Sequence, residues 1–178
     1  MERLIIPVSG APAAGKTTLA KELAAALRLP LICKDDIKEA LVDALDGPAS
    51  DFGWSRQVGG AAMQVLWRIA ERCPVAVLEA NFRPHNPYEH DRLRRLDARI
   101  IEINCVCPAD ELARRFALRA QAAHVAHPLT ELSADLLAEY DRPMGIGEVI
   151  EVDTSMPVDL ARLTSRIETF IGTRRVHP

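Results

Sequence analysis

The sequence lacks the features that mark membrane proteins, disulfide-rich secreted proteins and general nucleic-acid binders. None of its apolar runs approaches the roughly 20 residues of a membrane span, and the start of the chain has no signal-peptide pattern. Its four cysteines form no C-x-x-C pair. A net charge of −3 and a pI near 6.0 provide no broad basic surface for nucleic acid. We therefore expect a cytoplasmic protein with reduced cysteines and no membrane partner.

Lysine and aromatic residues are also scarce. Aromatic residues make up 4% of the 178 residues, and arginine supplies most of the positive charge. The hydrophobic fraction of 48% and the charged fraction of 26% are nevertheless ordinary for a soluble globular protein. A chain of this length can bury a large core without disulfides. The sequence therefore predicts a single domain over residues 1–172 and a C-terminal tail over residues 173–178.

The most informative stretch has the sequence G-A-P-A-A-G-K-T and runs from Gly10 to Thr17. It matches the phosphate-binding P-loop pattern, in which glycines allow a tight turn between a strand and a helix. An apolar run over residues 4–8 predicts that strand, and apolar residues at helical spacing over residues 18–27 predict that helix. This combination predicts that the chain binds a nucleoside triphosphate, which we take to be ATP.

Each part of this loop has a predicted role. Backbone N–H groups and the helix N-terminus would hold the α- and β-phosphates, without a donor from Pro12 because proline has no N–H group. Lys16 would contact the β- and γ-phosphates, and the Thr17 hydroxyl would bind Mg²⁺. The predicted nucleotide-binding residues in this stretch are Gly10, Ala13, Ala14, Gly15, Lys16, Thr17 and Thr18.

Strand and helix patterns alternate along the chain. Strands are predicted at Leu4–Ser9, Leu31–Cys33, Val75–Ala80, Arg99–Val106 and Val149–Asp153. Helices are predicted at Thr17–Leu27, Asp36–Leu45, Ser55–Arg72, Glu89–Leu96, Pro108–Arg119, Ser133–Tyr140 and Pro157–Ile171. This alternation predicts a three-layer α/β fold with a five-stranded parallel sheet, and a ligand site outside the carboxyl ends of the strands.

Two residues after the second predicted strand are candidates for chemistry on an acceptor. Asp35 would lie at the same edge of the sheet as the P-loop, where a carboxylate could take the proton from an attacking hydroxyl group. Lys38, about one helical turn later, could hold an anionic or polar part of the acceptor. The structural alternative is that Asp35 or Asp36 only caps the following helix.

The segments G-A-P-A-A-G-K-T-T-L-A and K-D-D-I-K, separated by a short strand, resemble the small P-loop kinases. That family includes polynucleotide 5′-hydroxyl kinases, chloramphenicol phosphotransferases and zeta toxins. The resemblance implies a fold like that of nucleoside monophosphate kinases, with an arginine-bearing helical lid. It implies that Asp35 is the general base and that Lys38 contacts the acceptor, although the family more often has arginine at the second position.

The end of the third predicted strand carries a further acidic residue. Glu79 has the position of a Walker B carboxylate, which orients Mg²⁺ or its water beside the P-loop threonine. The resembled family usually has aspartate there, so Glu79 could instead contact the acceptor or face solvent. Asn81 and Arg83 follow at the same edge and are predicted to bind the acceptor.

An arginine-rich helix at Pro108–Arg119 is the candidate lid, over approximately residues 114–130. In the resembled kinases, a lid arginine neutralises the charge that develops on the transferred phosphoryl group. Arg119 is the candidate for this catalytic role, and Arg115 is the candidate for contact with the nucleotide. The alternative is a solvated arginine face.

Together these residues predict a kinase that moves the ATP γ-phosphate to a hydroxyl group of a small molecule. A 5′-hydroxyl polynucleotide kinase is an alternative, although the sequence has no dense lysine–arginine stretch for a nucleic acid. A nucleotide-dependent switch or ATPase that acts on a protein partner is a second alternative. It is disfavoured because the chain has no N-K-x-D motif and because a switch does not require Asp35 or Lys38. The oligomeric state cannot be inferred from these patterns.

Overall fold

The computed structural model describes residues 3–45, 47–48, 51–121, 124–127 and 131–172. The predicted C-terminal tail, residues 173–178, lies outside the described residues, as do parts of the predicted lid at 122–123 and 128–130. Among the described residues, none of the helices is both long and apolar enough to cross a membrane.

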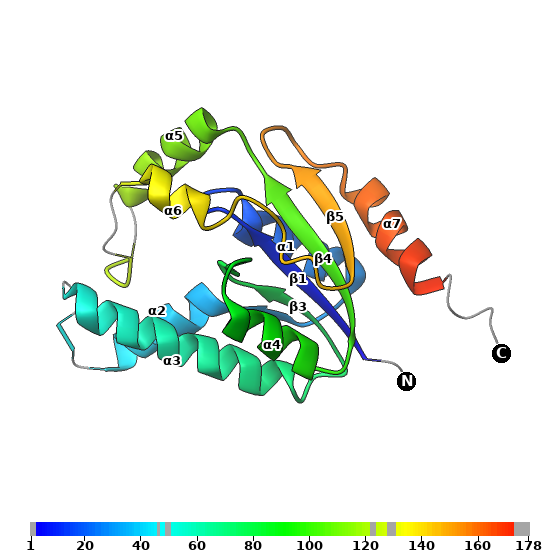
Figure 1. The fold of residues 1–178 in the computed structure, drawn as a ribbon, viewed down its shortest axis with the longest axis horizontal. Coiled ribbons are helices and arrows are strands. Elements are labelled where there is room, and N and C mark those ends of the chain that lie inside the picture. The colour runs from blue at the N-terminus through cyan, green and yellow to red at the C-terminus, as the bar shows by residue number, and fades with distance from the viewer. Residues whose placement is uncertain (1–2, 46, 49–50, 122–123, 128–130, 173–178) are drawn as a thin grey trace.

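A parallel sheet of five strands forms the centre of the fold (Figure 1). The strands are β1 (Leu4–Gly10), β2 (Leu31–Cys33), β3 (Val75–Glu79), β4 (Arg99–Val106) and β5 (Glu148–Asp153). Their order across the sheet is β2-β3-β1-β4-β5. The predicted fold class, with its five parallel strands, is therefore confirmed.

The helices follow the strands in alternation. They are α1 (Lys16–Leu27), α2 (Lys34–Ala44), α3 (Phe52–Ala70), α4 (Pro87–Arg95), α5 (Ala109–Ala120), α6 (Ala134–Ala138) and α7 (Leu160–Gly172). Most boundaries lie within a few residues of the predicted ones. The largest shifts are at the starts of α3 and α7. The helix α3 begins at Phe52 instead of Ser55, because Asp51 caps it by accepting a hydrogen bond of 2.8 Å from the Trp54 amide. The helix α7 begins at Leu160 instead of Pro157.

Alternate residues of β1 face two different hydrophobic clusters. Ile6 and Val8 pack with α1 and α7 on one face of the sheet, whereas Ile5 packs with α3 and α4 on the other. Figure 1 shows these two pairs of helices on opposite faces. The sheet is thus covered on both sides, which explains why its strands are almost continuously apolar.

The carboxyl ends of three adjacent strands meet at one edge of the sheet. The P-loop follows β1, α2 follows β2, and the segment from Ala80 to Asn81 follows β3. Since β2, β3 and β1 are neighbours, residues from distant parts of the chain converge there. The helices α5 and α6 lie above this edge in Figure 1.

Candidate active site

The P-loop turns sharply between β1 and α1. Gly10, Ala13 and Gly15 have positive φ angles of 130°, 66° and 76°. Glycine is required at the first of these positions, because a Cβ there would lie 2.4 Å from the carbonyl oxygen of Cys105 on β4. The backbones of β1 and β4 therefore approach closely at Gly10, and this contact fixes where the loop begins.

Lys16 is the first residue of α1 and is 5% exposed. Its Nζ atom donates a hydrogen bond of 2.7 Å to the carbonyl oxygen of Ala11, within the loop itself. Burial lowers the pKa of this ammonium group, while the charges of Glu79 and Asp35 oppose that shift. A phosphate oxygen could replace the neutral carbonyl and supply the counter-charge that a buried ammonium group needs.

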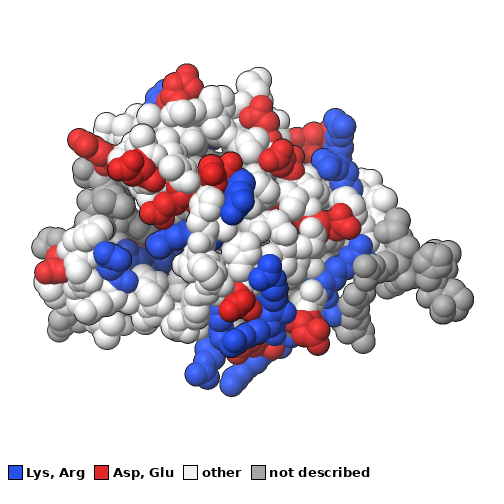
Figure 2. All heavy atoms as spheres, in the orientation of Figure 1, with Lys and Arg blue, Asp and Glu red and all other residues white. Residues whose placement is uncertain are grey.

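A cavity of about 180 Å³ opens beside the P-loop. Ligand pockets that enclose a whole drug-sized molecule measure roughly 300–1,000 Å³, so this cavity is smaller than a site for such a molecule. Figure 2 shows a hollow at this side of the molecule, with basic side chains inside it and acidic ones along its upper rim. The lining residues of the cavity are Ala13, Gly15, Lys16, Thr17, Thr18, Asp35, Glu79, Asn81, Arg115 and Arg119.

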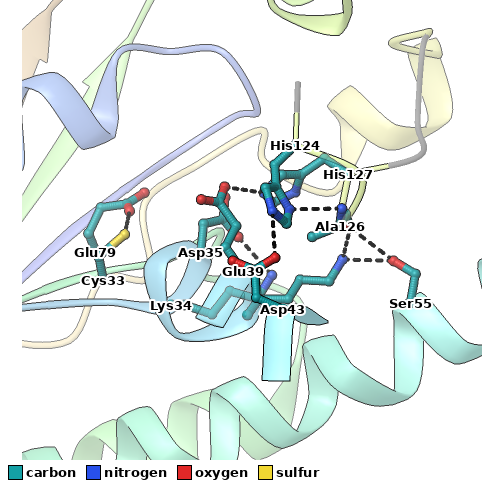
Figure 3. Close-up of polar contacts among 11 residues, drawn as sticks. Cys33, Lys34, Asp35, Glu39, Asp43, Ser55, Glu79, His124, Ala126 and His127 are labelled. Carbon is teal, nitrogen blue, oxygen red and sulfur yellow. Dashed lines mark hydrogen bonds and ion pairs between the residues drawn. The ribbon is translucent and has the colours of Figure 1, made fainter. Parts of the chain in front are cut away.

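Glu79 ends β3 and is 3% exposed. Its Oε2 atom accepts a hydrogen bond of 2.8 Å from the thiol of Cys33 (Figure 3). Burial raises the pKa of the Glu79 carboxyl, against the charge of Lys16 and hydrogen bonds from Cys33 and Thr17. A divalent cation at this carboxylate would favour its ionised form.

The oxygen atoms at this point fit a magnesium ion. Thr17 and Glu79 both line the cavity, and Mg²⁺ prefers oxygen ligands. No group of three or more His, Cys, Asp or Glu side chains that could hold a metal occurs among the described residues. Mg²⁺ is commonly bound by one or two carboxylates together with substrate phosphates.

Asp35 lies in the first turn of α2 and lines the cavity. Its Oδ1 atom pairs with Lys34 Nζ at 2.9 Å. Burial alone would raise the pKa of this carboxyl. The charge and the hydrogen bond of Lys34, together with the charges of His127 and Lys16, have the larger effect, so the pKa lies below its ordinary value. The carboxylate therefore stays ionised at neutral pH, as a proton acceptor must.

The two candidate lid arginines differ in their contacts. Arg115 donates to Glu111 at 2.6 Å and to the carbonyl oxygen of Thr154 at 2.9 Å. Arg119 has its guanidinium carbon 5.4 Å from the ring centre of Phe116 and makes no ion pair with any described residue. Both line the cavity, but only Arg115 forms an ion pair with a carboxylate of the described residues.

Thr154, just after β5, was not predicted as a site residue. Its hydroxyl donates a hydrogen bond of 2.8 Å to the carbonyl oxygen of Ala14, while its own carbonyl accepts from Arg115. It thereby ties the P-loop to α5. The sequence offers no signal for this role, because an isolated threonine at a strand end is common.

Four of the predicted site residues, Gly10, Ala14, Arg83 and Lys38, do not line the cavity. Ala14 is buried, and its carbonyl oxygen accepts the hydrogen bond from Thr154. Gly10 ends β1, and its role is to let the backbone pass close to β4 before the loop begins. The guanidinium group of Arg83 lies 3.5 Å from the carboxylate of Glu139 in the segment after α6. Lys38 Nζ donates to Ser55 Oγ at 2.8 Å and to the carbonyl oxygen of Ala126.

The 124–127 segment, which follows α5 in the chain, docks on α2 and α3 (Figure 3). His124 Nε2 lies 3.0 Å from Asp43 Oδ1, and His127 Nε2 lies 2.9 Å from Glu39 Oε1. Ala126, between the two histidines, is fully buried and packs against Val42 and Val58. Part of the predicted lid thus lies close to Asp35.

Comparison with known families and structures gives a consistent result. A family model described as an AAA domain matches residues 5–143 of the chain. A comparison with curated proteins finds no match.

Several solved structures share the fold. A protein from Chloroflexus aurantiacus, provisionally described as a kinase, is 33% identical with a TM-score of 0.83, over 95% of this chain and 98% of that one. Shikimate kinase from Acinetobacter baumannii is 18% identical with a TM-score of 0.67, over 97% and 95% of the two chains. The APS kinase CysC from Mycobacterium tuberculosis is 14% identical with a TM-score of 0.63, over 97% and 99%. At these lower identities the last two show the fold alone.

Proposed function

The chain belongs to the AAA domain family of P-loop proteins, and from this premise we infer that it is a kinase that transfers the ATP γ-phosphate to a hydroxyl group of a small molecule. The kinase description of the 33% identical Chloroflexus protein supports this reaction class. The small acceptors named for two structural neighbours, shikimate kinase and APS kinase, support a small-molecule acceptor. The four free cysteines support a reducing compartment such as the cytoplasm.

We propose that the nucleotide phosphates bind in the cradle of P-loop amides. Lys16 would exchange the carbonyl oxygen of Ala11 for phosphate oxygens, which supply the missing counter-charge. Thr17 and Glu79 would hold Mg²⁺, which when bound neutralises phosphate charge. The backbone of Ala13 to Gly15 and the side chains of Thr18 and Arg115 complete the proposed nucleotide site.

Asp35 would act as the general base. Its carboxylate would accept the proton of the acceptor hydroxyl as that oxygen bonds to the γ-phosphorus, while the bond from phosphorus to the β,γ-bridging oxygen breaks and ADP leaves. Arg119 would stabilise the charge that develops on the transferred group, since no described carboxylate pairs with it. We propose that a lid over residues 114–130, within a single domain over residues 1–172, brings it into place.

One observation carries this proposal. Lys16 and Asp35 line the same cavity, although they follow different strands and Asp35 is positioned by α2. A nucleotide switch needs a phosphate-binding lysine, but it has no use for an ionised carboxylate facing the γ-phosphate position. The pairing of the two groups therefore favours transfer to an acceptor over a switch.

The test measures transfer of ³²P from γ-labelled ATP to a panel of acceptors. The panel holds nucleosides, sugars, hydroxy acids, amino alcohols, hydroxylated antibiotics and 5′-hydroxyl oligonucleotides. Asp35→Asn is expected to lower kcat by about 10²–10⁴-fold with little change in ATP affinity. Asp36→Asn is the matched control, because Asp36 is the exposed neighbour in the same turn.

The outcomes separate the proposed function from its alternatives. A labelled small molecule that is lost with Asp35→Asn supports the kinase. A labelled oligonucleotide as the sole product would favour a polynucleotide kinase. Tight ATP binding with no acceptor-dependent product, and an unchanged basal ATPase in Asp35→Asn, would overturn the proposal in favour of a switch.

A further inference from the structure

The helix α5 is tied to the P-loop through Arg115. This side chain donates a hydrogen bond of 2.9 Å to the carbonyl oxygen of Thr154, whose hydroxyl donates to the carbonyl oxygen of Ala14. Arg119, one helical turn later, lines the cavity and has no carboxylate partner among the described residues. Its position at the cavity therefore also depends on what holds the end of α5.

The 124–127 segment follows that end of α5 closely in the chain. The helix ends at Ala120, and the segment begins at His124. Because an extended chain advances by at most about 3.6 Å per residue, these two residues can be no more than about 14 Å apart. A fixed position for the segment therefore limits how far the last turn of α5 can swing away from the cavity.

One buried carbonyl group anchors this segment. Ala126 is fully buried and packs against Val42 of α2 and Val58 of α3. Its carbonyl oxygen accepts hydrogen bonds from Lys38 Nζ and from Ser55 Oγ, the latter at 3.0 Å. Both donors are buried, and Lys38 Nζ also donates to Ser55 Oγ at 2.8 Å. Because a hydrogen bond from a charged donor is stronger than one from a neutral donor, Lys38 is the main polar anchor.

Two histidine contacts flank this anchor (Figure 3). His124 pairs with Asp43 at 3.0 Å, and His127 pairs with Glu39 at 2.9 Å. The two carboxylates are four residues apart on α2 and so lie on the same face of that helix. Both carboxylates are exposed, Asp43 at 69% and Glu39 at 39%, so these pairs should hold the segment less strongly than the buried anchor does.

We propose that Lys38 is a positioning residue that fastens the 124–127 segment onto α2 and α3 and thereby holds Arg119 at the cavity. The inference rests on the proposed kinase function and concerns the same site. The helix α5 would be held at two points, by Arg115 at Thr154 and by the segment that Lys38 anchors. Without this anchor the last turn of α5 would populate positions farther from the cavity, so that Arg119 would face the transferred phosphate less of the time.

The first experiment measures whether Lys38 acts through Arg119, with an acceptor found in the transfer assay. Lys38→Met is expected to lower kcat about tenfold or more, with KM for the acceptor within about threefold of wild type. In the Arg119→Ala background the same substitution should change kcat by less than about twofold, because the group through which it acts is gone. A side chain that touches the acceptor would instead raise the acceptor KM in both backgrounds. Lys21→Met is the matched control, because Lys21 is exposed on α1.

The second experiment, amide hydrogen exchange of the protein alone, needs no acceptor. The amides of Ala126 and His127 donate to His124, to its Nδ1 atom at 3.1 Å and to its carbonyl oxygen at 2.9 Å. Their exchange therefore reports on the docking of the segment. Lys38→Met is expected to speed exchange about tenfold or more in the 124–127 segment and in the last turn of α5, with exchange in β1 unchanged. Lys21→Met should exchange like wild type.

Ser55→Ala repeats both measurements without removing a charge. This separates the hydrogen bond to Ala126 from the effect that the Lys38 charge has on Asp35. The changes should have the same direction and be smaller, because a neutral donor is lost. Gln57→Ala is the control, because Gln57 is exposed on the same helix. If circular dichroism shows that Lys38→Met does not fold, Ser55→Ala decides the result.

The outcomes distinguish this inference from the proposed function. Faster exchange in both the 124–127 segment and the last turn of α5 supports the positioning role, even if no transfer is found and the kinase proposal fails. Unchanged exchange at either place overturns the role while the kinase stands. An equal loss of kcat on Lys38→Met in the wild-type and Arg119→Ala backgrounds overturns it as well, because Lys38 would then act independently of Arg119.

Discussion

The thiol of Cys33 donates a hydrogen bond to the carboxylate of Glu79 across the pair formed by β2 and β3, where the two residues are direct register partners. Both side chains are buried, at 4% and 3% exposure. Burial raises the pKa of the Cys33 thiol far above its ordinary value, so the sulfur stays a hydrogen-bond donor. The thiol therefore holds one carboxylate oxygen of Glu79 and leaves the other for the cavity.

Cys33→Ala is expected to weaken the binding of Mg²⁺ at Glu79. Without the donor, the Glu79 carboxylate loses its fixed orientation, and the Mg²⁺ concentration for half-maximal activity should rise about 10-fold or more, a typical cost for a lost outer-shell partner. Cys33→Ser, which keeps a donor, should lie close to wild type. Calorimetry of ATP binding with and without Mg²⁺ provides a readout apart from activity. Equal Mg²⁺ dependence in the alanine and serine variants would contradict the role.

Substitution of Arg119 and of Arg115 should affect different kinetic constants. Arg119→Ala is expected to lower kcat by about 10²–10³-fold with little change in KM for ATP, because its guanidinium group, which pairs with no carboxylate of the described residues, would act on the transition state. Arg115→Ala should instead raise KM for ATP, since it breaks the tie to Thr154. Arg114 is the control: it is 61% exposed and pairs only with Glu111 among the described residues. If Arg114→Ala were as damaging as Arg119→Ala, the assignment would be wrong.

The pH dependence should reflect the lowered pKa of Asp35. Because Asp35 must be ionised to act as a base, its acid limb in kcat lies below its ordinary value of 3.8. The ionised carboxylate likewise contributes stability that is present above its unfolded pKa and is lost as the pH falls through the lower folded pKa. Lys34→Met removes the main positive charge that lowers the Asp35 pKa. Burial should then raise this pKa, so that the acid limb of the kcat profile moves to higher pH.

This shift is measured from kcat profiles at saturating acceptor from about pH 2.5 to pH 8, so that the acid limb of the wild type falls within the range. Lys21→Met serves as the control, because Lys21 lies on the exposed side of α1. An acid limb at the same pH in Lys34→Met and wild type would show that Lys34 does not set the charge state of Asp35.

Gly10→Ala should destabilise the protein strongly. The new Cβ would clash with the carbonyl oxygen of Cys105, at a φ of 130° that side chains rarely adopt. The cost should be about 3 kcal/mol or more, from strain together with overpacking. Gly60→Ala is the contrast: nothing lies within 4 Å, and α3 should gain about 0.5–1 kcal/mol. Urea denaturation of the two variants measures both effects.

The sequence predicted the parts of the site that depend on local pattern. The P-loop, the parallel sheet and the position of Asp35 follow from short-range spacing and from the rule that parallel strands end at one edge. Residues that act through tertiary contacts were missed. The contact of Cys33 with Glu79 requires knowing that β2 and β3 are neighbours, and that of Thr154 with Ala14 joins residues at opposite ends of the chain.

The predicted acceptor residues show a second limit of sequence reasoning. The sequence predicts Arg83 as an acceptor residue because it follows a strand that ends at the cavity, and Lys38 because of its place one helical turn after such a strand and because of the family resemblance. Arg83 instead faces Glu139, and Lys38 contacts Ser55 and Ala126. A flexible side chain of several carbons can reach in many directions, so position at a strand end does not determine its partner. Their roles toward the acceptor stay predictions.

The register of β1 against β4 has a consequence for synthesis of the chain. Gly10 pairs with Cys105, and β1 lies between β3 and β4 in the sheet. At about 5–20 residues per second, a ribosome would take on the order of 5–20 s to produce the second partner after the first. During that interval the apolar first strand has no complete set of neighbours. The phosphate-binding loop, although encoded at the very beginning, takes its final shape only after more than half of the chain has been made.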